Sequence, residues 1–181
     1  MMDGVFQTAF PGMVAASATT FTALLFLRAA WHKASDFSTL TGYVADYQLL
    51  PEGLVEPVAR LLIAAEIATV LLLVLPMTAG FAASLAILLL GTYAAGIAIN
   101  IGRGRTRIEC GCGGPDQPLS AALLVRNTLL AGIAAMVLMV TERPLGIAEA
   151  AVALGCGLMA WLIYAVIEQL LANAGHSRLT R

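Results

Sequence analysis

The sequence predicts an all-α protein: a polytopic transmembrane bundle with a four-helix core and a fifth, C-terminal span. Hydrophobic residues make up 60% of the 181 residues, charged residues make up 12%, and the mean hydropathy is +0.87. These values lie outside the range of soluble domains. The apolar stretches are long and rich in Ala and Leu, whereas a membrane β-barrel needs short alternating segments. Because one crossing takes about 20 apolar residues, we expect four or five spans in a single membrane domain covering residues 1–181.

The first span is predicted over residues 11–28, within a stretch that carries no charge between residues 4 and 27. The stretch lacks the basic start and the small-residue cleavage site of a signal peptide, so we expect a retained helix. An interfacial loop over residues 31–57 follows. In it the rings of Tyr43 and Tyr47 are expected to lie at the depth of the lipid headgroups.

Four further spans are predicted along the rest of the chain. The uncharged stretch after Glu66 is too long for one crossing, and Pro76 to Gly80 offers a turn that makes it a hairpin. Thr141 to Pro144 interrupt the apolar pattern a second time. The predicted segments are spans at 58–75 and 81–101, a cysteine loop at 102–118, and spans at 119–140 and 147–167. Five crossings place the two termini on opposite sides of the membrane.

Basic residues gather on one side of this predicted topology. Arg143 alone falls on the other side, and the basic side holds Arg28, Lys33, Arg60, Arg103, Arg105, Arg107, Arg126, Arg178 and Arg181. The positive-inside rule puts that side, with the cysteine loop, in the cytoplasm. Basic residues that serve a buried site are not topological signals, so sidedness stays open. The net charge of -1 gives no reason to expect a nucleic-acid partner; membrane-bound or periplasmic proteins are the expected partners.

The cysteine loop carries the motif Cys110-Gly111-Cys112-Gly113-Gly114. Two cysteines this close form a small, strained ring when oxidised, and a strained, exposed disulfide is a good exchange partner. Glycine supplies the backbone freedom that such a loop needs, and positive charge from Arg105 or Arg107 favours the reactive thiolate. We therefore take Cys110 and Cys112 as candidate catalytic residues, with a purely structural pair as the alternative.

A metal site is not expected, because zinc needs about four ligands and only the two loop cysteines and His32 are candidates. Cys156, inside the fifth span, is most simply a small buried apolar residue. Its alternative role is that of a partner thiol within the membrane.

A second polar cluster follows the first span and includes Arg28, His32, Lys33 and Asp36. Arg28 and His32 are four residues apart and so share one helix face. The topology places this segment on the same side as the cysteine loop. It either forms a polar roof over the loop or only anchors the bundle at the interface.

Glu66 is an ionisable residue inside the second span, where an unpaired charge is expensive. We expect it to pair with Arg126 or Arg28 across the bundle, either to fix helix packing or to relay protons to the thiols. Asn100 and Asn127 are expected to form hydrogen bonds between helices.

These residues together resemble a known family. Arg28, Lys33, Asp36, Phe37, Tyr47 and Leu50-Pro51, followed by Glu66 and the cysteine motif, are similar to the methylamine utilisation protein MauE family, within the broader DoxX-like membrane proteins. The resemblance covers roughly the first 140 residues. It implies a multi-pass protein of the cytoplasmic (inner) membrane of methylotrophic bacteria. Its implied task is the processing, transport or maturation of the methylamine dehydrogenase β (small) subunit, a periplasmic quinoprotein subunit with many disulfides.

The resemblance also implies a partner, the membrane-anchored thioredoxin-like protein MauD, with which Cys110 and Cys112 would exchange electrons. Periplasmic disulfides require the cysteine pair to face outward, against the positive-inside count. Basic residues that belong to the site, or an interfacial segment that changes the span count, would resolve the conflict. A third resolution is an electron conduit from the cytoplasm with Cys156 as the midway thiol.

Other functions stay open at this stage. One is a non-enzymatic assembly or export partner for which the cysteine loop is only a docking surface. A small-molecule transporter is a weaker option, because inverted repeats are not visible in the sequence. A quinone is a candidate electron acceptor by analogy with other disulfide-forming membrane bundles, although no residue pattern identifies a quinone pocket.

Overall fold

The computed structural model describes residues 2–112, 117–139 and 145–179, with side chains between Phe10 and Asn173 apart from the two gaps. Five long helices fill most of it: α1 (Met2–Ser35), α3 (Glu52–Val74), α4 (Ala79–Gly102), α5 (Ala121–Met136) and α6 (Ile147–Leu179). Each is long and apolar enough to cross a membrane, α5 together with the short helix that continues it to Met139. The predicted all-α transmembrane bundle is therefore confirmed.

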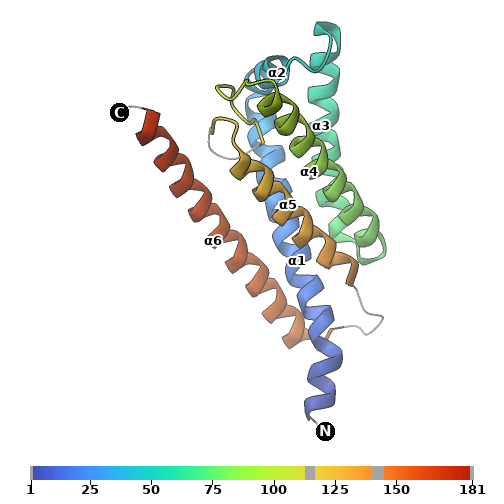
Figure 1. The fold of residues 1–181 in the computed structure, drawn as a ribbon. Coiled ribbons are helices and arrows are strands. Elements are labelled where there is room, and N and C mark those ends of the chain that lie inside the picture. Colours follow the sequence, from blue (N-terminus) through green and yellow to red (C-terminus); the bar gives the residue numbers. More distant parts are fainter. Residues whose placement is uncertain (1, 113–116, 140–144, 180–181) are drawn as a thin grey trace.

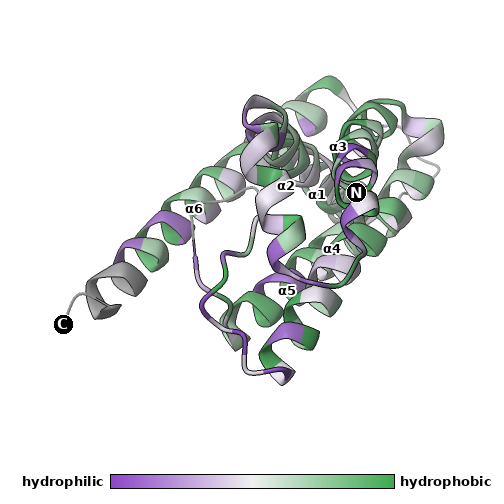
Figure 2. Ribbon diagram, turned by 90° about the horizontal axis from the view of Figure 1, so that it is seen from above, coloured by the Kyte–Doolittle hydropathy of each residue, from purple (hydrophilic) through white to green (hydrophobic). Residues whose placement is uncertain are grey.

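Helices α1, α3, α4 and α5 form the core, and α6 packs mainly along α1 (Figure 1). Buried apolar residues of α1, α4 and α5 meet at its centre, among them Phe21, Phe26, Leu90 and Leu130. The outer faces carry exposed large apolar side chains, and hydrophobic residues, drawn in green, recur along α4, α5 and α6 in Figure 2. An apolar exterior is the surface that lipid requires.

Helix α6 approaches α1 closely at Gly157. A Cβ atom at this position would lie 2.5 Å from the backbone oxygen of Ser17 and 2.6 Å from Cβ of Thr20. Small residues allow helix backbones to come together in membranes. Gly157 therefore permits the crossing that carries the polar end of α6 to the site described below.

The structure extends several of the predicted spans. Helix α1 continues beyond residue 28 to Ser35, and α6 continues beyond residue 167. The predicted interfacial loop at 31–57 is mostly helical, because it contains the end of α1, the short helix α2 (Phe37–Asp46) and the start of α3. Because of these extensions, Lys33 lies on α1 and Glu168 lies on α6, and each helix holds its residue at a fixed place in the bundle.

The predicted turn between the second and third spans is confirmed as the short 3₁₀ helix η1 (Pro76–Thr78). A second 3₁₀ helix, η2 (Val137–Met139), ends the fourth crossing. The predicted break at residues 141–144 lies outside the described residues. The N-terminal end of α1 and the C-terminal end of α6 lie at opposite ends of the bundle, as expected for five crossings (Figure 1).

Candidate functional site

Cys110 and Cys112 form a disulfide in the loop that joins α4 to α5. The backbone of this loop is held by an antiparallel bridge between Glu109 and Pro118 and by a hydrogen bond from the Cys110 amide to the Gln117 carbonyl oxygen at 3.1 Å. Cys110 is 8% exposed, whereas Cys112 is half-buried. The two sulfurs therefore differ in their access to an external reactant.

Helix α2 packs on the cysteine loop through Tyr43. Gly111 has φ +63°, and a Cβ atom there would lie 2.8 Å from Cδ2 of Tyr43. Glycine is required between the cysteines for two reasons, since other residues rarely adopt this conformation and the tyrosine ring leaves no room for a side chain. The contact seats α2 directly on the disulfide loop.

Asp36 starts α2 and fixes its position. Its carboxylate accepts hydrogen bonds from the Thr39 amide at 3.0 Å, the Thr39 hydroxyl at 2.7 Å and the Ser38 hydroxyl at 2.9 Å. The hydrogen bonds from Thr39 lead the causes that lower the pKa of Asp36 below its ordinary value. Asp36 is therefore an N-cap of the helix that covers the loop, rather than a group in contact with sulfur.

Tyr47 follows α2 and holds the loop from the same side. Its hydroxyl donates a hydrogen bond to the Cys110 carbonyl oxygen at 2.9 Å. Burial raises the pKa of Tyr47 to about 12, against the nearby positive charge of Arg126. The hydroxyl therefore keeps its proton at physiological pH and remains a donor.

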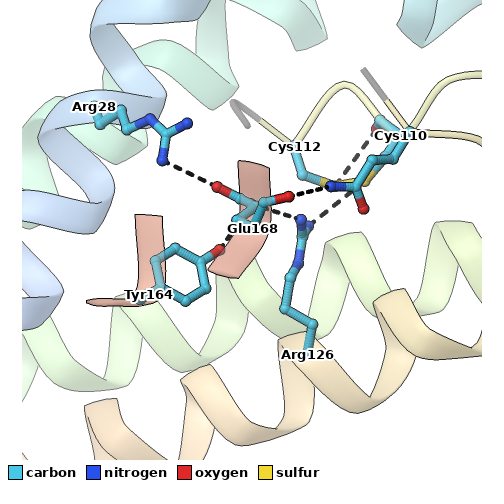
Figure 3. A network of polar contacts seen from close by, with 7 residues as sticks. Arg28, Cys110, Cys112, Arg126, Tyr164 and Glu168 are labelled. Atoms are coloured by element: carbon cyan, nitrogen blue, oxygen red, sulfur yellow. Dashed lines mark hydrogen bonds and ion pairs between the residues drawn. A yellow bond between two sulfur atoms is a disulfide. The ribbon is translucent and has the colours of Figure 1, made fainter. Parts of the chain in front are cut away.

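Arg126 of α5 connects the disulfide to α6 (Figure 3). Its Nη2 lies 3.7 Å from Sγ of Cys110, and its Nη1 donates to Oε1 of Glu168 at 2.9 Å. Arg28 donates to the other carboxylate oxygen of Glu168 at 3.0 Å, and the Tyr164 hydroxyl donates to Oε1 at 2.9 Å. The Glu168 side chain is 4% exposed. Two arginines compensate its buried charge, as a carboxylate in this setting requires.

Lys33, Glu66 and Tyr93 form a second buried cluster. The Lys33 ammonium donates to Oε1 of Glu66, and the Tyr93 hydroxyl donates to the same oxygen at 2.6 Å. The prediction that Glu66 pairs with Arg126 or Arg28 was wrong. Lys33 and Arg28 are five residues apart on α1 and so point about 140° apart around the helix, which turns Arg28 to α6 and Lys33 to α3.

A small cavity of about 30 Å³ lies between the two clusters. Its walls include Cys112, Arg126 and Glu168 on one side and Glu66 and Tyr93 on the other. Such a volume has room for water, but it is far below the roughly 300 Å³ of the smallest usual cofactor pockets. The cavity therefore does not fit a quinone ring.

Other residues singled out in the sequence lie apart from the sulfurs. Arg107 is exposed and Arg105 is partly buried, and no described contact joins either side chain to a cysteine of the pair. The cation that contacts Cys110 is Arg126 instead. Cys156 is an exposed free thiol rather than a buried one, because its face of α6 points away from α1.

The two asparagines do not form the expected bonds between helices. Asn100 donates to the Gly96 carbonyl oxygen of its own helix at 3.1 Å. Nδ2 of Asn127 is buried without a hydrogen-bond partner among the described residues. That orphaned donor lines the cavity described above.

The sequence analysis missed Tyr93, Tyr164 and Glu168. It missed Glu168 because the fifth span was ended at residue 167. A usable signal was present: Tyr164 and Glu168 are four residues apart and therefore share one helix face. An acidic residue at the end of an apolar span calls for a cationic partner, and Arg28 and Arg126 were available.

Comparisons with known proteins identify the family of the chain. The family model described as "Methylamine utilisation protein MauE" matches residues 11–140. Curated relatives named methylamine utilization protein MauE include those of Paracoccus versutus, 38% identical over 80% of this chain and 80% of the relative, and of Methylophilus methylotrophus, 36% identical over 83% and 82%. No solved structure matches the chain. The family model covers most of the bundle, and the disulfide loop lies within the matched residues. The chain therefore belongs to the MauE family of methylamine utilisation proteins.

Proposed function

We propose that this multi-pass membrane protein of the methylamine utilisation system supports disulfide formation during maturation of the methylamine dehydrogenase β subunit. It acts by thiol-disulfide exchange between the Cys110–Cys112 pair and a thioredoxin-fold partner of the MauD type in the cytoplasmic (inner) membrane. One observation carries the proposal: a disulfide at one end of the bundle has an arginine 3.7 Å from one of its sulfurs. A cation at that distance stabilises a thiolate.

The different surroundings of the two sulfurs assign their roles. A partner thiolate attacks Cys112, the more accessible sulfur, and a mixed disulfide forms while the bond to Cys110 breaks. The electron pair of that bond stays on Cys110 as a thiolate beside Arg126. A second partner thiol then displaces Cys112, so that a partner dithiol becomes a disulfide and the cysteine pair becomes reduced. The reverse sequence reduces a partner disulfide and re-forms the Cys110–Cys112 bond, with the same roles.

We place the cysteine loop on the periplasmic side. Support comes from the basic residues, since Arg28, Lys33 and Arg126 form buried or partly buried ion pairs in the site. These three residues serve the site and do not count as topological signals. The other basic residues still lie mostly on the side of the cysteine loop, so the sidedness of the loop is tested directly.

The cysteine roles are tested with single serine variants mixed with a thioredoxin-fold protein in its disulfide form, which the remaining cysteine attacks. Cys110→Ser leaves Cys112 free and is expected to accumulate a mixed disulfide through that residue, whereas Cys112→Ser accumulates little. In cells, both variants are expected to stop β-subunit maturation at normal protein levels. Maturation that persists in the double serine variant would instead identify the loop as a docking surface.

Sidedness is tested by labelling Cys110 and Cys112 with a membrane-impermeant maleimide on intact cells and on inverted vesicles, before and after reduction. Reduction-dependent labelling from outside is the expected result. Labelling only from the cytoplasm would contradict periplasmic exchange and favour an electron conduit. Direct relay through Cys156 is opposed by its position, since at about 1.5 Å of rise per residue it lies roughly 18 Å along α6 from Glu168.

A further inference from the structure

Several residues that line the cavity next to the disulfide carry buried polar atoms that lack a partner among the described residues. Three atoms of residues on its walls are buried without a hydrogen-bond partner among the described residues: Oε2 of Glu66, Nε of Arg126 and Nδ2 of Asn127. Buried polar atoms normally find a partner. One acceptor and two donors suit water, which both donates and accepts and needs two to four polar neighbours. The cavity volume of about 30 Å³ accommodates it.

The cavity joins two chemical groups that have no direct contact. On one side Cys112 borders it, and on the other side Glu66 borders it with Tyr93. Glu66 is fully buried and Lys33 is 3% exposed, so their shared proton has no direct access to solvent. The cavity therefore offers the buried ion pair a route to a sulfur atom.

A second small cavity, of about 20 Å³, lies on the other side of Lys33. Its walls include His32, Lys33, Asp36 and Gly111. His32 and Asp36 are exposed, so this cavity lies between the buried ammonium and the outside water. Lys33 borders this second cavity and its partner Glu66 borders the larger one, so the ion pair stands between the two cavities.

We propose that water in the larger cavity carries a proton between the Lys33–Glu66 pair and the Cys112 sulfur, and that the second cavity returns the proton from outside. The inference rests on the proposed thiol-disulfide exchange. It adds Glu66 and Lys33 to that reaction as proton carriers, with Tyr93 as the positioning residue that holds Oε1 of Glu66.

The atoms and electrons of the step balance as follows. A partner dithiol gives two electrons to the disulfide and releases two protons as it becomes a disulfide. Cys110 keeps its electron pair as a thiolate beside Arg126, and Cys112 leaves as a thiolate that takes one proton through the cavity. The ion pair is then one proton short until outside water returns one. One proton is released overall.

Glu66 is surrounded by a defined set of ionisable groups. Lys33 from α1 and Tyr93 from α4 contact it directly. Across the cavity lie Arg28, Arg126 and Glu168, a network of two arginines and one carboxylate whose groups stay the same when Glu66 is replaced. A change in the pH dependence of the second exchange step after substitution of Glu66 would therefore report on the Lys33–Glu66–Tyr93 cluster.

The test separates the two exchange steps in protein held in lipid nanodiscs. Glutathione, a monothiol, forms the mixed disulfide at Cys112 and reports the first step, while dithiothreitol completes the reduction and reports the second. Samples are quenched with acid between pH 6 and pH 9, alkylated and weighed by mass spectrometry. For Glu66→Gln we expect the first step to stay within about twofold of wild type and the second to slow about tenfold or more, the low end of proton-transfer catalysis.

Two further variants guard against loss of folding in Glu66→Gln, which leaves Lys33 buried without a carboxylate. Lys33→Met combined with Glu66→Gln removes both charges. Ala29→Val adds volume at the wall of the cavity and replaces no ionisable residue. Both are expected to slow only the second step. The matched control is Glu56→Gln, which changes the same residue type in an exposed ion pair with Arg60 on the same helix.

The relay is overturned if both steps fall equally in the folded variants, which is the result of a structural role, or if the second step keeps its wild-type rate. Failure of the proposed function has a different signature, because the wild-type protein would then form no mixed disulfide with glutathione.

Discussion

Replacing Arg126 by Met is expected to slow attack on the disulfide by removing the cation beside the leaving sulfur. In the structure, Nη2 of Arg126 lies 3.7 Å from Sγ of Cys110. At this distance two unit charges attract by about 1 kcal/mol in water and about 4 kcal/mol at an effective dielectric constant of 20. Without Arg126, the thiolate form of Cys110 should lose between about 1 and about 4 kcal/mol of stabilisation.

The rate effect is smaller than the full interaction, because the transition state carries only part of the thiolate charge. Taking about half of the charge, in line with the Brønsted slope of roughly 0.4–0.5 for thiol exchange, the barrier rises by about 0.5–2 kcal/mol. At roughly 1.4 kcal/mol per factor of ten, the first exchange step slows about two- to thirtyfold.

The assay is the glutathione mixed-disulfide rate in nanodiscs at fixed pH, read by quenching and mass spectrometry. Arg126→Met also leaves Glu168 with Arg28 as its remaining arginine, so the double variant with Glu168→Gln is measured beside it. Arg60→Met, an exposed arginine in a surface pair, is the control for a general loss of positive charge. Wild-type rates in both Arg126 variants, or an equal fall in Arg60→Met, would refute the reasoning.

Three further predictions follow from contacts around the loop and α6. Gly111→Ala should separate the cysteine loop from α2, at a cost of about 1–2 kcal/mol for the left-handed backbone alone, and should therefore speed alkylation of reduced Cys110. The control is Gly104→Ala, since Gly104 has φ +74° but no atom within 4 Å of the added Cβ, and it should leave the alkylation rate unchanged. For Tyr47, burial raises the pKa from 10.0 to about 12, so its stabilising effect is complete below pH 10 and is lost as the pH rises to about 12. Thermal unfolding between these pH values should therefore show a steeper loss of stability in wild type than in Tyr47→Phe, and equal slopes would contradict a buried hydroxyl. Gly157→Ala should separate α6 from α1 and cost about 1–3 kcal/mol of stability by overpacking. Gly155→Ala should leave stability unchanged, because no atom lies within 4 Å of its added Cβ, and equal unfolding temperatures of the two variants would argue against the close crossing.

The sequence alone was sufficient for the architecture. Apolar length and continuity predicted five spans, and the turn at η1 (Pro76–Thr78) followed from its proline between two apolar runs. In lipid, the backbone groups of a helix must be hydrogen-bonded within the helix itself, so a long apolar stretch of sequence directly predicts a helical span. The motif Cys110-Gly111-Cys112 likewise marked the candidate site, because two cysteines in a glycine-rich loop are visible as residue types.

Only the tertiary structure decided which charges meet. From the sequence, Arg28 and Arg126 were the expected cations for Glu66, because the length of α1 and the directions of its side chains are not visible there. Helix α1 continues to Ser35 and turns Lys33 to Glu66, while the Gly157 crossing brings Glu168 to Arg28 and Arg126. Pairing between distant residues depends on helix ends, rotation and crossing points, which local apolar patterns leave undetermined.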